Sequence, residues 1–120
     1  RRLKVGDIYI GKLLASSSPD SDGSWPCLAV RELLERVDSA EIENGFGTEI
    51  LNGLGVTSRG VLDGGDIERG HAARYREQAK LFVDQWPKTA RVLRRAAKSF
   101  DAMAREHDEE AERRRTGFER

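Results

Sequence analysis

Two residues with the spacing of a metal-binding motif stand in one predicted helix. Glu68 and His71 are three residues apart, so their side chains project from the same helical face. Di-iron helical bundles use this E-x-x-H spacing, but they need the motif twice and two further carboxylates. The other histidine, His107, is preceded three residues earlier by Ala104. The sequence therefore predicts no metal site, and we expect His71 to be hydrogen-bonded and partly buried.

A glycine-rich run over residues 53–60 invites comparison with a phosphate-binding loop. It lacks the G-K-[ST] sequence of a P-loop, and no strand evidently precedes it. An irregular connector explains the run better, and we predict no cofactor. An enzymatic interpretation remains open in which Arg59, Asp63, Asp66 and His71 converge in one pocket around this loop.

The single cysteine, Cys27, cannot form an internal disulfide. We expect it at the second position of a helix that begins with Pro26, near the positive end of the helix dipole. No histidine stands near it in sequence to act as a base, so packing is its expected role. One cysteine and two histidines are too few for a zinc site, and the chemistry suits a reducing cytoplasm.

Opposite charges separate along the C-terminal half of the chain. Residues 69–98 hold nine basic and two acidic residues, a net charge of +7, whereas residues 101–112 hold one basic and six acidic residues, a net charge of −5. On a helical wheel, five cations lie opposite the apolar stripe and form a basic row. These are Lys88, Arg91, Arg94, Arg95 and Lys98. Such a row can meet an acidic protein surface, a second copy of the chain or phosphates, or it can simply be a solvated helix face.

The elements that must position these residues belong to one small domain. The chain has 120 residues, 21 Lys+Arg and 21 Asp+Glu, and 38% hydrophobic residues, which suits a single globular unit. Zero net charge excludes the simplest case of nucleic-acid or membrane binding, in which a large excess of positive charge drives association. No apolar run reaches the roughly 18 residues that a membrane span needs. The first residue is Arg1, so we expect a fragment of a larger protein.

Apolar spacing predicts helices along most of the chain. We expect a helix from Leu3 to Ala15, a loop over residues 16–25, and a helix from Pro26 to about Asp38 that buries Leu28, Ala29, Leu33, Leu34 and Val37. Seven glycines between residues 40 and 65 predict an irregular middle with short helical turns at 40–44 and 48–51.

Two long helices follow and should fold back on each other. Asp63 or Asp66 is expected to cap the first, which runs to Pro87, and Pro87 starts the second. The tail over residues 113–120 is expected to fray. The predicted fold is therefore all-α, with a long C-terminal antiparallel helix hairpin. Its expected core residues are Tyr75, Phe82, Trp86, Leu93, Phe100 and Met103.

Four strings in the sequence resemble a segment near the C-terminal end of some long uncharacterised bacterial proteins. They lie at residues 22–33 (DG-x-WP-x-x-AVREL), 55–59 (GVTSR), 64–69 (GG-x-x-ER) and 86–93 (WP-x-TA-x-x-L). No activity is assigned to that segment, so the resemblance implies no catalytic residue. It implies a bacterial cytoplasmic module, covering about residues 3–112, attached to a longer chain.

The sequence thus favours a non-enzymatic protein-interaction or scaffolding module whose partner is another protein or a second copy. Its expected contact surface is the charged outer face of the hairpin. The alternative is a nucleic-acid-binding accessory domain that uses the basic row. The candidate contact residues in both cases are Arg74, Arg76, Lys88, Arg91, Arg94, Arg95 and Lys98.

Overall fold

The computed structural model describes residues 2–37, 39–53 and 65–119, and these ranges hold five helices. The helices are α1 (Arg2–Ala15), α2 (Leu28–Arg36), α3 (Ala40–Gly53), α4 (Asp66–Phe82) and α5 (Pro87–Glu119). The predicted all-α fold is confirmed. No helix in the described ranges is long and apolar enough to cross a bilayer.

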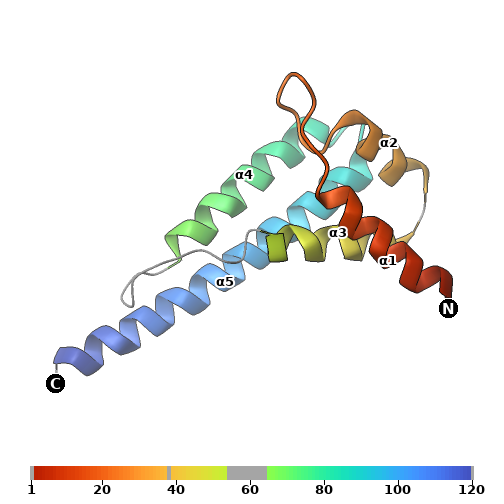
Figure 1. The fold of residues 1–120 in the computed structure, drawn as a ribbon. Coiled ribbons are helices and arrows are strands. Elements are labelled where there is room, and N and C mark those ends of the chain that lie inside the picture. Colours follow the sequence, from red (N-terminus) through yellow and green to blue (C-terminus); the bar gives the residue numbers. More distant parts are fainter. Residues whose placement is uncertain (1, 38, 54–64, 120) are drawn as a thin grey trace.

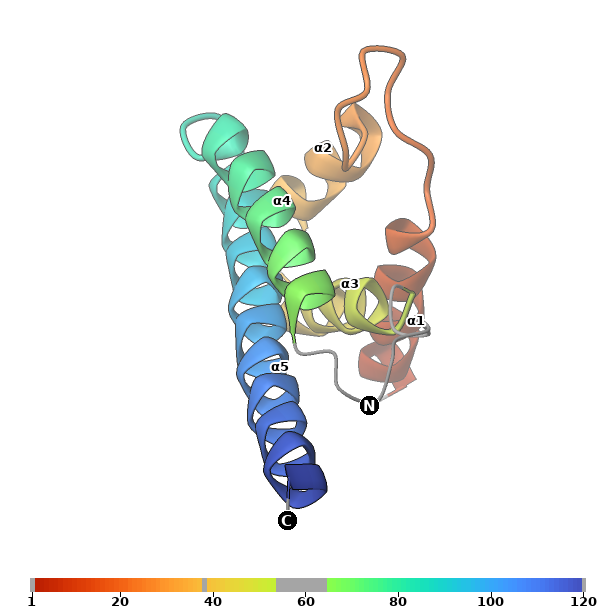
Figure 2. The same cartoon turned by 90° about the vertical axis from the view of Figure 1, so that its left-hand side faces the viewer.

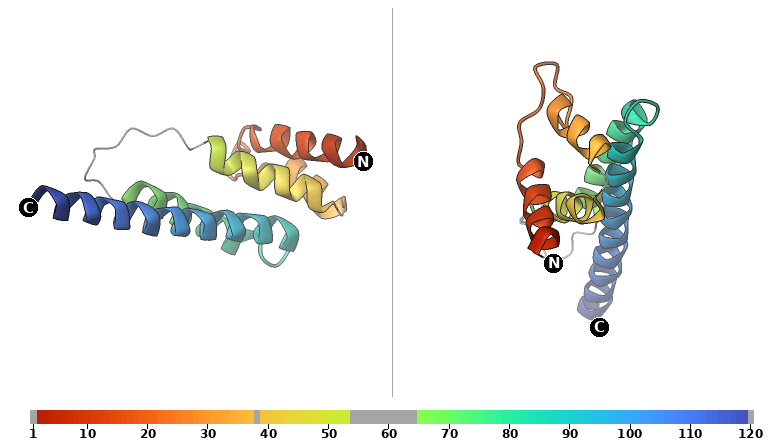
Figure 3. Two further views of the ribbon diagram at one scale, coloured as in Figure 1. Left: turned by 90° about the horizontal axis from the view of Figure 1, so that it is seen from below. Right: turned by 90° about the vertical axis from the view of Figure 1, so that its right-hand side faces the viewer.

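Helices α4 and α5 form the predicted antiparallel hairpin and make one layer of the molecule (Figure 1). Helix α3 packs on α5, and α1 packs on the far side of α3, so α3 lies between α1 and α5 (Figure 2). Helix α2 lies near the end of the hairpin at which α4 turns into α5. Helix α5 continues past the start of α4, and the two layers are seen edge-on in Figure 3.

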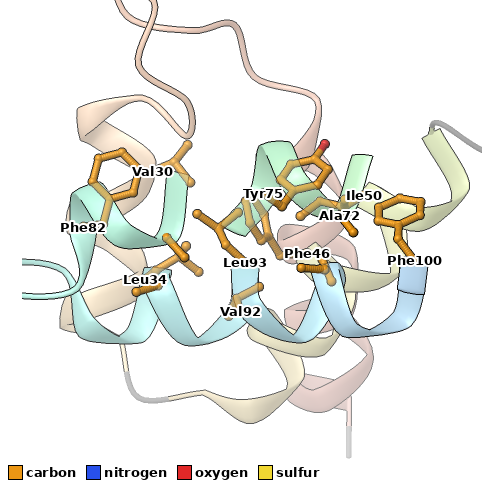
Figure 4. Packing of buried hydrophobic residues seen from close by; sticks show 14 of the residues in the cluster. Val30, Leu34, Phe46, Ile50, Ala72, Tyr75, Phe82, Val92, Leu93 and Phe100 are labelled. Atoms are coloured by element: carbon orange, nitrogen blue, oxygen red, sulfur yellow. The ribbon is translucent and has the colours of Figure 1, made fainter. Parts of the chain in front are cut away.

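The core lies where α2, α3, α4 and α5 meet (Figure 4). Tyr75, Phe82, Leu93 and Phe100 are buried as predicted, whereas Trp86 and Met103 are only partly buried against the core. Tyr75 and Phe100 stack with ring centroids 5.9 Å apart. The sequence prediction omitted the α3 contribution, in which Ile42, Phe46 and Ile50 repeat at four-residue spacing and bury one face of that helix.

The predicted irregular middle is wrong for residues 40–53, which form one continuous helix. Glycine lowers helix propensity, but here it permits close packing. Gly45 is buried, and its backbone lies 3.1 Å from where a Cβ on Gly11 of α1 would stand. Residues 54–64 lie outside the described ranges.

Helix α2 begins later than predicted, and it buries the predicted Leu34 but not Leu28 or Ala29. Cys27 is the N-cap and Pro26 precedes it, so Cys27 does not occupy the second helical position. Val30 and Leu34 are buried, whereas Leu28 is 46% exposed and Ala29 is exposed. Leu28 lies about 160° around the helix from Val30, so the two side chains cannot face the same core.

The ends of the hairpin helices also differ from the prediction. Gly65 caps α4 and Asp66 is its first residue, while Asp63 lies outside the described ranges. Helix α4 ends at Phe82, and a turn leads to Pro87, which starts α5 as predicted.

The tail over residues 113–120 was expected to fray, and in the structure α5 continues as helix to Glu119. Ion pairs Arg114–Glu110 and Arg115–Glu112 join successive turns there, and pairs at this spacing stabilise a solvated helix.

Candidate functional site

Three cations of the predicted basic row are exposed on the outer side of α5. Arg94, Arg95 and Lys98 occupy adjacent turns of a helix whose opposite side packs into the core. The Arg95 guanidinium lies 3.5 Å from the Asn44 side-chain oxygen. Among the described residues, no carboxylate oxygen lies within 4 Å of these three cations. These side chains therefore present positive charge to solvent.

Lys88 belongs to the start of α5 and does not extend the outward row. The Glu35 carboxylate of α2 accepts hydrogen bonds from the backbone N–H groups of Lys88 and Thr89, at 3.2 and 2.8 Å. The Lys88 ammonium in turn donates to the Glu35 backbone carbonyl at 3.3 Å. Glu35 thus caps α5 from another helix, and the half-buried Lys88 serves that contact.

Arg91 is likewise engaged within the chain. Its Nη2 atom lies 2.9 and 2.7 Å from the two carboxylate oxygens of Glu43 on α3. The Glu43 side chain is only 4% exposed, whereas the Arg91 side chain is 50% exposed. The pair joins α3 to α5, because a buried carboxylate needs a partner. Two of the five predicted cations therefore stabilise the fold.

Arg74 and Arg76 lie on α4 and are not part of the row. Arg76 forms an ion pair with Asp101, which links the two helices of the hairpin. The Arg74 guanidinium lies 5.6 Å from the Tyr75 ring centroid and has its Nη2 3.4 Å from Nδ1 of His71. The seven predicted contact residues thus divide among three roles, and only Arg94, Arg95 and Lys98 remain available to a partner along α5.

Acidic residues follow the cations along the same helix. Glu106, Glu109 and Glu112 are exposed, whereas the Asp108 side chain bonds to residues at the start of α4. The Asp108 carboxylate accepts the Gly65 backbone N–H at 2.7 Å and pairs with Arg69 at 2.6 Å. These bonds lower the pKa of Asp108 below its usual value, and the Arg69 hydrogen bond is the larger cause.

A small groove lies beside the three exposed cations. It has a volume of about 160 Å³ and runs between α3 and α5. Sequence reasoning missed this groove, because its two walls come from segments about fifty residues apart and no local pattern joins them. Its lining includes Asn44, Thr48, Leu51, Val92, Arg95 and Ser99.

The Glu68–His71 spacing does not form a metal centre with described residues. Glu68 is buried and has its Oε2 atom 3.6 Å from Nε2 of His107 on α5. The His71 ring instead packs against Phe100 with centroids 5.2 Å apart. Burial, and secondly the Arg74 cation, lower the pKa of His71. No group of three or more His, Cys, Asp or Glu side chains within the described part of the chain is placed to hold a metal ion.

The open enzymatic interpretation involves residues that the structure describes only in part. Arg59, Asp63 and most of the glycine-rich run lie outside the described ranges. Asp66 is exposed and pairs with Arg69 on the surface, and His71 is partly buried on α4. Cys27, the other reactive group considered, is partly buried and packs against the core.

A comparison of the chain with protein-family models, with curated proteins and with solved structures finds no match.

Proposed function

We propose that this chain is a non-enzymatic protein-interaction module that binds an acidic protein segment along α5. One observation carries the proposal: the outer side of α5 exposes a cluster of three cations, and exposed carboxylates follow it on the same helix. We call Arg94, Arg95 and Lys98 the cation cluster. The bacterial resemblance of the sequence adds the expectation that the module belongs to a longer chain.

The shape of the molecule supports an interaction role. Its solvent-accessible surface is 7845 Å², whereas a compact monomer of this mass exposes about 6,500 Å². Its radius of gyration is 16.6 Å, against about 14 Å for a compact domain of this length. The surplus surface reflects a 33-residue α5 that continues beyond its 17-residue hairpin partner α4. A helix that projects in this way offers contact area that the fold itself does not use.

The charge order along α5 supports selection of an oriented partner. Because the whole chain has zero net charge, attraction must come from local patches. A partner with acidic residues beside the cation cluster and basic residues beside Glu106 and Glu109 is favoured in one direction over the other. Charge complementarity of this kind raises the association rate and fixes the register.

The groove beside Arg95 supplies a second element of recognition. At about 160 Å³ it has room for one side chain from the partner. Its polar lining from Asn44, Thr48 and Ser99 favours a partner side chain with a hydrogen-bonding end, while Leu51 and Val92 contact its apolar part. Contacts at the groove would add shape selectivity to the electrostatic attraction.

A protein partner is favoured over a nucleic acid because the basic row is shorter than the sequence suggested. Lys88 and Arg91 already bind Glu35 and Glu43, which leaves three outward cations. Nucleic-acid affinity grows with the number of phosphates neutralised, and three cations neutralise few of them.

Fluorescence anisotropy with two labelled probes tests the proposal. The probes are a polyglutamate peptide and a short DNA duplex, each titrated with the chain at low salt and again at about 150 mM salt. We expect binding of polyglutamate and a loss of at least about tenfold in affinity for the double variant Arg94→Glu/Lys98→Glu. The matched control is Arg74→Glu/Lys80→Glu, which reverses two exposed cations on α4 and should leave binding unchanged.

Two outcomes contradict the proposal. If the cation-cluster variant and the α4 control bind polyglutamate equally, the interaction is not located on α5. If the duplex binds and polyglutamate does not, with an affinity that falls steeply between 50 and 200 mM salt, the nucleic-acid alternative replaces it.

A further inference from the structure

The outer face of α1 exposes a row of apolar residues that no other helix of the described ranges covers. Tyr9 and Leu13 are each 67% exposed, and Ile10 is 41% exposed. Gly6 stands on the same side, and a Cβ placed there meets no atom within 4 Å. We call Gly6, Tyr9, Ile10 and Leu13 the α1 seam.

Helix α1 also has apolar residues on its inner side, where Leu14 and Ala15 pack against the core. Gly11 faces α3, and Tyr9 and Leu13 each lie about 160° around the helix from it. Helix α1 packs mainly on α3, at the edge of the molecule farthest from α5 (Figure 2). A helix with apolar residues on opposite faces is typically buried on both. A second element is therefore expected to cover the α1 seam.

The seam has the spacing of a helix-contact surface. Its members stand at positions i, i+3, i+4 and i+7, which is the pattern by which one helix packs against another. The seam continues into a groove of about 320 Å³ between α1 and α2, because Leu14 follows Ile10 by four residues and lines that groove with Ala29 and Leu33.

The order of residues in the seam makes it complementary to itself. When two copies of α1 pair in antiparallel orientation about a point between Tyr9 and Ile10, each Gly6 meets Leu13 of the other copy. Each Tyr9 then meets Ile10 of the other copy. The small Gly6 therefore faces the larger Leu13 on both sides of the two-fold axis. An isologous interface requires such reciprocal contacts.

The available area agrees with a dimer of modest stability. The exposed parts of the seam and the adjoining groove residues amount to roughly 400 Å² of apolar surface per copy. Since about 60% of a dimer interface is apolar, this corresponds to a total buried area of roughly 1,300 Å², above the 1,000 Å² or so that a specific interface needs. Glu32 and Arg36 at the groove supply opposite charges for its rim.

We propose that the chain forms a symmetric dimer in which the α1 seams of two copies pack antiparallel. This surface lies on a different helix from the cation cluster, so the dimer and the proposed partner site can exist independently. The two interfaces also differ in their response to salt. Added salt weakens a contact between exposed charges but leaves an apolar contact intact.

Sedimentation equilibrium of the purified 120-residue chain, across a concentration series at about 150 mM salt, tests the dimer. We expect a monomer–dimer equilibrium for the wild type and dimerisation weakened about 100-fold by Leu13→Lys, since the contact is lost on both sides of the two-fold axis. The matched control is Leu81→Lys on α4, where the leucine is 72% exposed outside the seam. That variant should dimerise like the wild type, and far-UV circular dichroism should show both variants folded.

A charge pair tests the antiparallel register. Gly6→Glu alone should weaken the dimer, because its carboxylate would face Leu13 of the other copy. The double variant Gly6→Glu/Leu13→Lys should recover dimerisation relative to either single variant, because opposite charges then face each other twice.

A wild type that stays monomeric at millimolar concentration would overturn the proposal and assign the seam to a different protein. Unchanged dimerisation of Leu13→Lys would overturn it as well. A double variant no better than its single parents would overturn the antiparallel register. None of these results bears on polyglutamate binding at the cation cluster.

Discussion

Gly11 of α1 lies so close to Ile42 of α3 that a Cβ on the glycine would stand 2.2 Å from the Ile42 carbonyl oxygen and 2.6 Å from the Phe46 backbone nitrogen. Both contacts are with helix backbone, which cannot move aside as a side chain can. Glycine is therefore required at this crossing, and it sets the distance between the two helices.

Gly11→Ala should lower the free energy of unfolding by about 2–3 kcal/mol, because relief of the clash must separate α1 from α3. Urea denaturation measures the loss. The control is Gly70→Ala, at an exposed position within α4 where a Cβ meets nothing within 4 Å. It should raise the free energy of unfolding by about 0.5–1 kcal/mol through helix propensity. Equal effects of the two substitutions would contradict the close crossing.

Arg91 and Glu43 form an ion pair, and removal of Arg91 leaves the buried Glu43 carboxylate without this partner. Arg91→Leu should reduce the free energy of unfolding by about 1–3 kcal/mol, since the Glu43 carboxylate then lacks this partner and water can reach it only in part. Arg94→Leu, which removes a cation of the same helix that has no carboxylate partner in the described structure, should change stability by less than about 0.5 kcal/mol. Denaturation midpoints of the two variants compare them directly, and a neutral Arg91→Leu would show that the pair does not stabilise the fold.

Glu35 caps α5 through the backbone N–H groups of Lys88 and Thr89. Glu35→Ala should cost about 1 kcal/mol of stability, the usual value for loss of an N-cap. Glu32→Ala, at an exposed position on the same helix, should cost much less. Thermal unfolding of both variants, measured in dilute solution, checks the difference. If the two midpoints agree, the carboxylate of Glu35 contributes nothing to α5.

The contacts of Asp108 make the stability of the α4–α5 hairpin depend on pH in the acidic range. Its bonds to Arg69 and Gly65 lower its folded-state pKa below the ordinary 3.8, so folding favours the ionised form. The resulting stability is fully present above pH 3.8 and is lost as the pH falls through the lowered pKa. The stability difference between wild type and Asp108→Asn should therefore stay constant at neutral pH and shrink below that window. A difference independent of pH would refute the assignment.

His71 should titrate below its ordinary pKa of 6.5, because burial and, to a smaller extent, Arg74 oppose its protonation. Its folded-state pKa is depressed, so its contribution to stability is present above pH 6.5 and decreases as the pH falls through the lowered pKa. An NMR titration of the imidazole measures the pKa. Arg74→Met should raise it, but the value should remain below 6.5, since burial is the larger cause. A full return to the ordinary value would assign the shift to Arg74 instead.

Local signals predicted the helices where apolar spacing and proline agreed. The α4 and α5 stripes follow from periodicity, the loop after Ala15 from its run of turn-forming residues, and the start of α5 at Pro87 from the missing N–H of proline. Glycine misled the prediction in α3, because its low helix propensity is a local property. Its value in close packing against α1 depends on a neighbour about thirty residues away in sequence.

The sequence by itself determined that the chain is helical, that its last two amphipathic segments pair, and that positive charge precedes negative charge along α5. Only the tertiary structure decided which charges remain outward. A helical wheel places Arg91 and Arg94 alike, but Glu43 lies within reach of one and no described carboxylate lies near the other. The sequence also did not show that the outer face of α1 is exposed. A periodic pattern identifies the apolar residues of a helix, but it does not show which of its faces packs against another element. The physical reason is that burial and ion pairing depend on distances between segments remote in sequence, which folding alone establishes.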